Sequence, residues 1–218
     1  IQQGDRIGTL AWNTYRHYEL YFGVSGIGAV AHTINPRLFP EQIIYIINHA
    51  ADRFIFVDLT FVPLLEAVAS HISKVEGIVV LTDKAHMPTS SKLTNLICYE
   101  DVIADMPTEV TWPLFDEKCD AALCYTSGTT GNPKGVMYTH RSTVLHTIAS
   151  VQNNALNITN DTVLLPVVPM FHVNAWGTPY AATMTGAKIV FPAHGMDGAS
   201  LYELINGYAN FRGILMRD

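Results

Sequence analysis

The chain has 218 residues, of which 49% are hydrophobic and only 15% are charged, and its formal net charge is −6 at pH 7. This length suffices for one large domain or two small ones with a sizeable core. The negative charge and the lack of a Lys/Arg cluster exclude a nucleic-acid-binding protein, which needs a basic face for phosphates. No apolar run reaches the ~18 residues that a membrane span requires, so no transmembrane segment is expected.

The first half of the chain alternates between strand-like and helix-like patterns. Apolar runs at 6–10, 29–32, 53–58 and 77–81 predict strands, and the runs at 15–24 and 40–50 predict helices. Helix 40–50 has the clearest pattern, because a Pro and a Glu begin it and its isoleucines share one face. Segment 96–105 reads as a short helix. This alternation predicts a parallel sheet with crossover helices.

The second half starts with an apolar run at 119–127. Further strands are predicted at 135–140 and 187–192, helices at 141–156 and 175–186, and another apolar run at 162–176. We therefore expect an α/β fold of largely parallel sheets with flanking helices, divided into a first α/β subdomain (1–118) and a second (119–218). The loop after residue 126 should lie past the carboxyl end of a strand, where open α/β sheets bind ligands.

That loop, "YTSGTTGNPKG" (125–135), combines hydroxyl side chains, glycines and one lysine with no carboxylate. Backbone N–H groups, hydroxyls and an ammonium together indicate a site for an anion. The alternative is an ordinary flexible surface loop. The spacing differs from the phosphate loop of nucleoside triphosphatases, which needs four residues between its glycines.

A second glycine pattern, "GIGAVA" (26–31), matches the dinucleotide-binding motif by letter. It follows a helical pattern and precedes a strand, whereas that motif leaves a strand and opens a helix. A glycine-rich helix end is therefore the better interpretation.

The stretch "YTSGTTGNPKGVMYTH" (125–140) resembles the signature of the adenylate-forming superfamily: acyl-CoA synthetases, firefly luciferase-like enzymes and peptide-synthetase adenylation domains. Segments 28–50 and 165–192 resemble the same superfamily, and the latter is most similar to the medium- and long-chain fatty acyl branch. The resemblance implies that the chain is part of the large N-terminal domain of such an enzyme.

The resemblance also implies a two-step reaction with MgATP, in which a fatty acid carboxylate forms an acyl-adenylate and coenzyme A then displaces AMP. Thr126, Lys134 and His172 are the implied catalytic residues, and Thr126 is also the implied Mg²⁺ contact. The implied ATP-binding residues share the loop: Thr126, Ser127, Gly128, Thr129, Thr130, Gly131 and Lys134.

The acyl substrate is expected at "FHVNAW" (171–176). The resemblance implies that His172 positions the carboxylate or phosphate and that Val173 and Trp176 line the acyl channel, with Trp176 as a gate. The alternatives are a hydrogen-bonded histidine at a strand end and a tryptophan buried in the core.

The first residue is Ile1, not Met, and we expect the chain to be a fragment that is inactive alone, because the family's acidic metal ligand, ribose-binding aspartate and C-terminal lysine should lie beyond residue 218. The low charged fraction predicts a covered face and a homodimer. Three cysteines without C-x-x-C spacing favour a cytoplasmic protein. The alternatives are a non-catalytic nucleotide-binding fragment and an enzyme that adenylates an aryl or amino acid.

Overall fold

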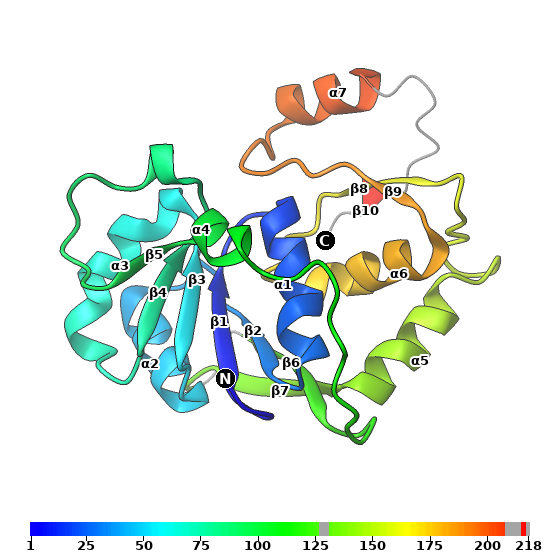
Figure 1. Ribbon diagram of the computed structural model, residues 1–218. Coiled ribbons are helices and arrows are strands. Elements are labelled where there is room, and N and C mark those ends of the chain that lie inside the picture. The colour runs from blue at the N-terminus through cyan, green and yellow to red at the C-terminus, as the bar shows by residue number, and fades with distance from the viewer. Residues whose placement is uncertain (127–130, 208–214, 217–218) are drawn as a thin grey trace.

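The computed structural model describes residues 1–126, 131–207 and 215–216, and its main feature is a seven-stranded sheet in the order β5-β4-β3-β1-β2-β6-β7 (Figure 1). Its strands are β1 (Arg6–Leu10), β2 (Val30–Thr33), β3 (Phe54–Val57), β4 (Gly77–Val80), β5 (Leu96–Cys98), β6 (Asp120–Thr126) and β7 (Lys134–Thr139). Neighbouring strands are parallel, except that β6 and β7 are antiparallel. The expected α/β fold with a largely parallel sheet is confirmed.

Helices cover both faces of this sheet: α1 (Tyr15–Gly26) and α4 (Tyr99–Ala104) on one, α2 (Pro40–Ala50) and α3 (Val62–Val68) on the other. Successive residues of β3 show the division. Ile55 belongs to the core cluster formed with α2 and α3, whereas Phe54 packs against the cluster formed with α1 and Tyr99. Strands buried on both faces need apolar residues at consecutive positions, which explains the continuous apolar runs in the sequence.

A smaller sheet lies beside the first, in the strand order β10-β8-β9. It consists of β8 (Val163–Pro166), β9 (Lys188–Ile189) and β10 (Leu215–Met216). The accompanying helices are α5 (His140–Ser150), α6 (Thr178–Thr185) and α7 (Gly198–Gly207). Strands β6 and β7 pair within the large sheet, so the chain after residue 119 contributes to both sheets. The division into subdomains at residue 119 stays a prediction. None of the helices in the described ranges has the length and apolar character needed to cross a membrane.

Some predicted elements have different bounds. Segment 96–105 forms the three-residue strand β5 followed by α4, because so short an edge strand has no readable periodicity. Helix α5 ends at Ser150 and not at residue 156. The helix expected from residue 175 begins at Thr178, since the residues before it adopt left-handed backbone conformations. Helices α3 and α7 were not predicted.

One buried side chain, Asn13, joins the two sheets. It follows β1 and is 1% exposed. Its Nδ2 donates to the carbonyl oxygens of Pro166 (2.8 Å) and Val168 (3.0 Å), and its Oδ1 accepts from the Met170 N–H (2.6 Å). Each such bond contributes ~1 kcal/mol to stability, and leaving a partner unpaired would cost more. The segment after β8, which carries His172, is thereby fixed against the carboxyl end of β1.

Candidate functional site

The hairpin between β6 and β7 presents the predicted anion-binding residues. Thr126 and Lys134 are the last paired residues, and the Thr126 hydroxyl donates to the Lys134 carbonyl at 3.5 Å. Residues 127–133 connect them; Ser127, Gly128, Thr129 and Thr130 lie outside the described residues. Lys134 is exposed, and within the described ranges no carboxylate forms an ion pair with it. Its charge is therefore available to an anion.

Strand β6 is anchored just before this loop. The Tyr125 hydroxyl hydrogen-bonds to Nδ1 of His49 on α2 at 2.6 Å. Its ring lies 5.1 Å from the ring of His32, whose Nδ1 bonds to the buried Asp52 carboxylate at 2.7 Å. Burial raises the pKa of Tyr125 to about 12, so the phenol stays protonated at neutral pH. These contacts fix the base of the hairpin loop.

A left-handed turn (Val173–Gly177) follows His172. The φ angles of Val173, Asn174, Ala175 and Trp176 are +46°, +51°, +47° and +56°, and that of Gly177 is +77°. A left-handed conformation costs an L-residue roughly 1–2 kcal/mol, and a β-branched residue such as Val adopts it rarely. Backbone strain of this kind persists only where surrounding contacts hold it, and such places are often functional.

The left-handed turn has one buried side and one exposed side. Asn174 and Ala175 are 6% and 0% exposed, whereas Val173 and Trp176 are 38% and 45% exposed. The Ala175 N–H donates to the His172 carbonyl at 3.0 Å, and the Thr178 hydroxyl donates to the Ala175 carbonyl at 2.8 Å. The interpretation of Trp176 as a core side chain is therefore wrong.

A cavity of about 280 Å³ lies against this turn. Residues from β7, α5, the turn and α6 line it, including Tyr138, His146, Val173, Asn174, Trp176 and Tyr180. A methyl group at Gly177 would lie 2.9 Å from Nδ1 of His146, so the absent side chain leaves room for the imidazole. The lining combines aromatic rings with the smaller residues Val173 and Gly177. A lining of this kind suits an apolar ligand.

The predicted site residues therefore lie in two groups. Thr126 and Lys134 lie at the hairpin, and Val173 and Trp176 line the cavity. The two groups are adjacent, because Sγ of Cys124, two residues before Thr126, lies 3.3 Å from Oδ1 of Asn174. His172 is exposed and precedes the turn, but it is not part of the cavity lining.

Several lining residues were not identified from the sequence. His146 carries no sequence signal, because its place opposite Gly177 depends on how α5 packs on the turn. The Tyr180 hydroxyl is buried without a hydrogen-bond partner in the described part of the chain, and burial raises its pKa. Tyr138 and Asn174 lie inside the matching stretches 125–140 and 171–176, but nothing in the sequence singles them out there.

Other candidate sites have structural explanations. Gly26 is the last residue of α1 and lies against the Trp112 ring, where a methyl group would be 2.3 Å from a ring carbon. This confirms that "GIGAVA" begins at a helix end and leads into β2, the reverse of the strand-to-helix order of the dinucleotide motif. A hollow of about 390 Å³ lies between the large sheet and helices α1 and α4, where Phe54, Leu20 and Val102 are among its lining residues. None of its lining residues belongs to the hairpin or to the left-handed turn.

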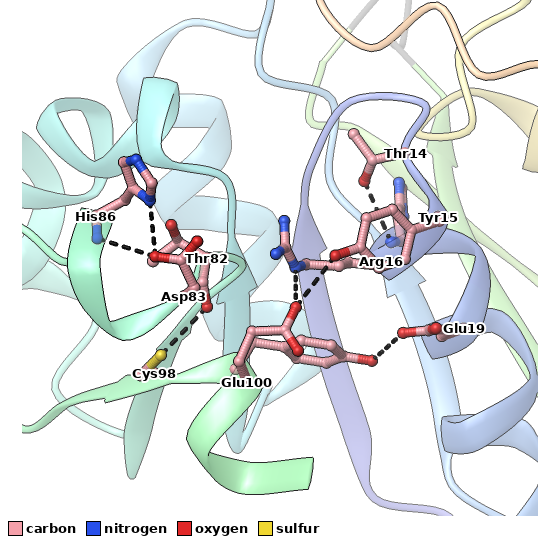
Figure 2. Close-up of polar contacts among 11 residues, drawn as sticks. Thr14, Tyr15, Arg16, Glu19, Thr82, Asp83, His86, Cys98 and Glu100 are labelled. Carbon is pink, nitrogen blue, oxygen red and sulfur yellow. Dashed lines mark hydrogen bonds and ion pairs between the residues drawn. The ribbon is translucent and has the colours of Figure 1, made fainter. Parts of the chain in front are cut away.

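Figure 2 shows a polar cluster where α1 and α4 begin. Glu100 accepts hydrogen bonds from Nε of Arg16 (2.7 Å) and from the Tyr15 hydroxyl (3.1 Å). The Tyr99 hydroxyl donates to Glu19 at 2.7 Å. Each of these charged groups has a partner, so the cluster ties the two helices together.

The chain resembles known proteins along nearly its whole length. It is 52% identical over 205 residues to the medium-chain-fatty-acid–CoA ligase of Ectopseudomonas oleovorans, covering 94% of this chain and 37% of that protein. It is 50% identical over 208 residues to the 3-methylmercaptopropionyl-CoA ligase of Ruegeria lacuscaerulensis, covering 95% and 38%. The chain thus spans less than two fifths of the length of these relatives.

Solved structures share the fold. A red-emitting luciferase from Phrixothrix hirtus superimposes with a TM-score of 0.80 at 21% identity, over 95% of this chain and 40% of the luciferase. The family model described as AMP-binding enzyme matches residues 1–209. A match over almost the whole described chain is decisive, and the chain belongs to the AMP-binding enzyme family.

Proposed function

We propose that the protein carrying this chain is an ATP-dependent fatty acid–CoA ligase. A fatty acid carboxylate would attack the α-phosphate of ATP to give an acyl-adenylate and pyrophosphate, and coenzyme A would then displace AMP. The observation that carries the proposal is the juxtaposition of the exposed Thr126–Lys134 hairpin end with the cavity at the left-handed turn. The names of the relatives at 50–52% identity support it.

The hairpin loop would act on the leaving group. A carboxylate is a weak nucleophile, so the reaction depends on stabilising the charge that develops on pyrophosphate. The Thr126 hydroxyl, the Lys134 ammonium and the loop residues Ser127, Gly128, Thr129, Thr130 and Gly131 would bind the phosphates. These donors suit a polyanion because Lys134 is exposed and the hairpin base is fixed.

Magnesium fits this donor set in part. Mg²⁺ binds through few protein oxygens together with substrate phosphates and water, and Thr126 offers one hydroxyl oxygen at the strand end. Bound with ATP, the ion would neutralise phosphate charge. The acidic ligand that the family resemblance implies would come from beyond this chain.

The cavity would bind the acyl chain. Val173 and Trp176 would line its mouth, with Trp176 moving as a gate, and exposed His172 would orient the carboxylate near the phosphates. An exposed indole beside Gly177 suits a movable group better than a fixed one. Aliphatic acids are favoured because the two relatives are named for a medium-chain fatty acid and for 3-methylmercaptopropionate.

A panel of acids tests the proposal. The full-length protein would be incubated with ATP, Mg²⁺, coenzyme A and C4 to C16 fatty acids, 3-methylmercaptopropionate, benzoate or amino acids, and acyl-CoA measured by mass spectrometry. Fatty acyl-CoA is the expected product. Products from only the aryl or amino acids would favour those adenylating enzymes, and nucleotide binding without product would favour a non-catalytic module.

We also propose a cytoplasmic homodimer. The connection before β6 carries four apolar side chains that are more than half exposed: Met106, Val110, Trp112 and Leu114. Exposed apolar groups of this kind favour an interface. The cysteines Cys98, Cys119 and Cys124 are unpaired, as in a reducing compartment. Light scattering that gives a monomer mass at micromolar concentration would refute the dimer, and cell fractionation tests the compartment.

A further inference from the structure

The buried side chain of Asn174 distinguishes it from its neighbours in the left-handed turn. Its amide points away from solvent, whereas Val173 and Trp176 are 38% and 45% exposed. Oδ1 of Asn174 accepts from Sγ of Cys124 on β6 at 3.3 Å, and the Tyr21 hydroxyl of α1 lies at 3.5 Å. This amide oxygen therefore contacts side chains from both β6 and α1.

The hydrogen bond from Cys124 is the stronger of these two contacts. The Tyr21 hydroxyl has a single proton and donates it to the Met170 carbonyl. It therefore has no second proton to donate to Asn174. Burial raises the pKa of the Cys124 thiol, which therefore stays protonated and can donate. The Thr33 hydroxyl of β2 lies 3.2 Å from the same sulfur and holds the thiol in place.

This contact has a consequence for the backbone of the turn. Of its four non-glycine residues with positive φ, only Asn174 is of a type that enters the left-handed region readily. Val173, Ala175 and Trp176 have no such preference. A fixed Asn174 amide thus selects the conformation that turns Val173 and Trp176 toward the cavity.

We propose that Asn174 is a positioning residue, which through Cys124 holds the rim of the acyl cavity at a fixed distance from the phosphate-binding hairpin. The inference rests on the proposed ligase function. Cys124 lies two residues before Thr126 on the same strand, so a loose turn would shift the acid relative to the phosphates. Binding of ATP would be little affected, because the hairpin itself is anchored by Tyr125 and His49.

Kinetics on the full-length protein test the proposal. Asn174→Gly keeps access to positive φ but removes the amide, and Cys124→Ala removes the donor. Each should raise KM for fatty acid about tenfold, the loss expected for one hydrogen bond, with KM for ATP within about twofold. Cys124→Ser retains a donor and should stay near wild type. Asn157→Ala is the matched control, because Asn157 also has positive φ (+50°) but is exposed and does not line the cavity.

A second readout does not depend on activity. Iodoacetamide labelling, followed by peptide mass spectrometry, should show Cys124 alkylated about tenfold faster in Asn174→Gly than in wild type. Cys98 is the internal reference, since its buried thiol donates to the Thr82 carbonyl, away from the turn. Its labelling should not change in Asn174→Gly or in Asn157→Ala.

The outcomes separate the two proposals. Unchanged Cys124 labelling in Asn174→Gly, or KM values for ATP and fatty acid that rise together, would overturn the role of Asn174. Wild-type protein without ligase activity would refute the proposed function, and the labelling result would still decide whether Asn174 shields Cys124.

Discussion

Gly177→Ala would test the geometry of the left-handed turn. Gly177 has a φ of +77°, where an alanine is disfavoured by ~1 kcal/mol or slightly more. The new methyl carbon would lie 2.9 Å from Nδ1 and 3.0 Å from Cε1 of His146. His146 is exposed and can rotate away, so the clash should add under ~1 kcal/mol. The total of ~1–2 kcal/mol corresponds to a Tm drop of roughly 2–8 °C, measurable by scanning fluorimetry.

A double-mutant cycle isolates the contribution of His146. In a His146→Ala background, Gly177→Ala should destabilise the protein only through its unfavourable φ, because the clash is absent. The coupling free energy between the two substitutions should therefore be ~0.5–1 kcal/mol. Gly186→Ala is the matched control, because Gly186 has a φ of +74° and nothing within 4 Å of the added methyl. Its effect should not depend on His146. Equal coupling at both glycines, or none at Gly177, would refute the packing of α5 against the turn.

Three further predictions concern single side chains. Trp176→Ala should destabilise by only ~1–2 kcal/mol, since the indole is 45% exposed, and should bind fatty acid without ATP; a loss of ~4 kcal/mol would contradict this. Thr126→Ala and Lys134→Ala should lower the adenylation rate ~10²–10³-fold with little change in ATP affinity, and unchanged rates would refute the role of these residues in stabilising the pyrophosphate leaving group. Burial lowers the pKa of His17 from 6.5 to about 4, so the contribution of His17 to the free energy of unfolding is fully present above pH 6.5 and should fall by ~3 kcal/mol toward pH 4. Urea titrations at several pH values should show this fall as a difference between wild type and His17→Gln, and a pH-independent difference would contradict it.

The sequence predicts the large sheet because its signals are local. Helix α2 has its expected bounds, 40–50, because Pro40 begins it and the buried Ile43, Ile46 and Ile47 share a face. The doubly buried strands also appear directly as apolar runs. The antiparallel direction of β7 was readable in principle, since the seven positions 127–133 are too few for a parallel crossover.

The candidate site is less evident from sequence. The hairpin loop is identifiable because its composition is local, whereas the left-handed turn is not, because Val173, Ala175 and Trp176 all prefer other backbone regions. One of its contacts joins Asn174 to Cys124, which are 50 positions apart in the chain. Local patterns cannot report a conformation that long-range packing imposes.

The most direct test of the account is ATP–pyrophosphate exchange by the full-length protein. Exchange requires the carboxylate to attack ATP and pyrophosphate to return, so it reports the step assigned to the hairpin without any contribution from coenzyme A. We predict exchange that depends on added fatty acid and that falls ~10²–10³-fold in Lys134→Ala. Fatty-acid-independent exchange, or exchange that is equally fast in Lys134→Ala, would contradict the account.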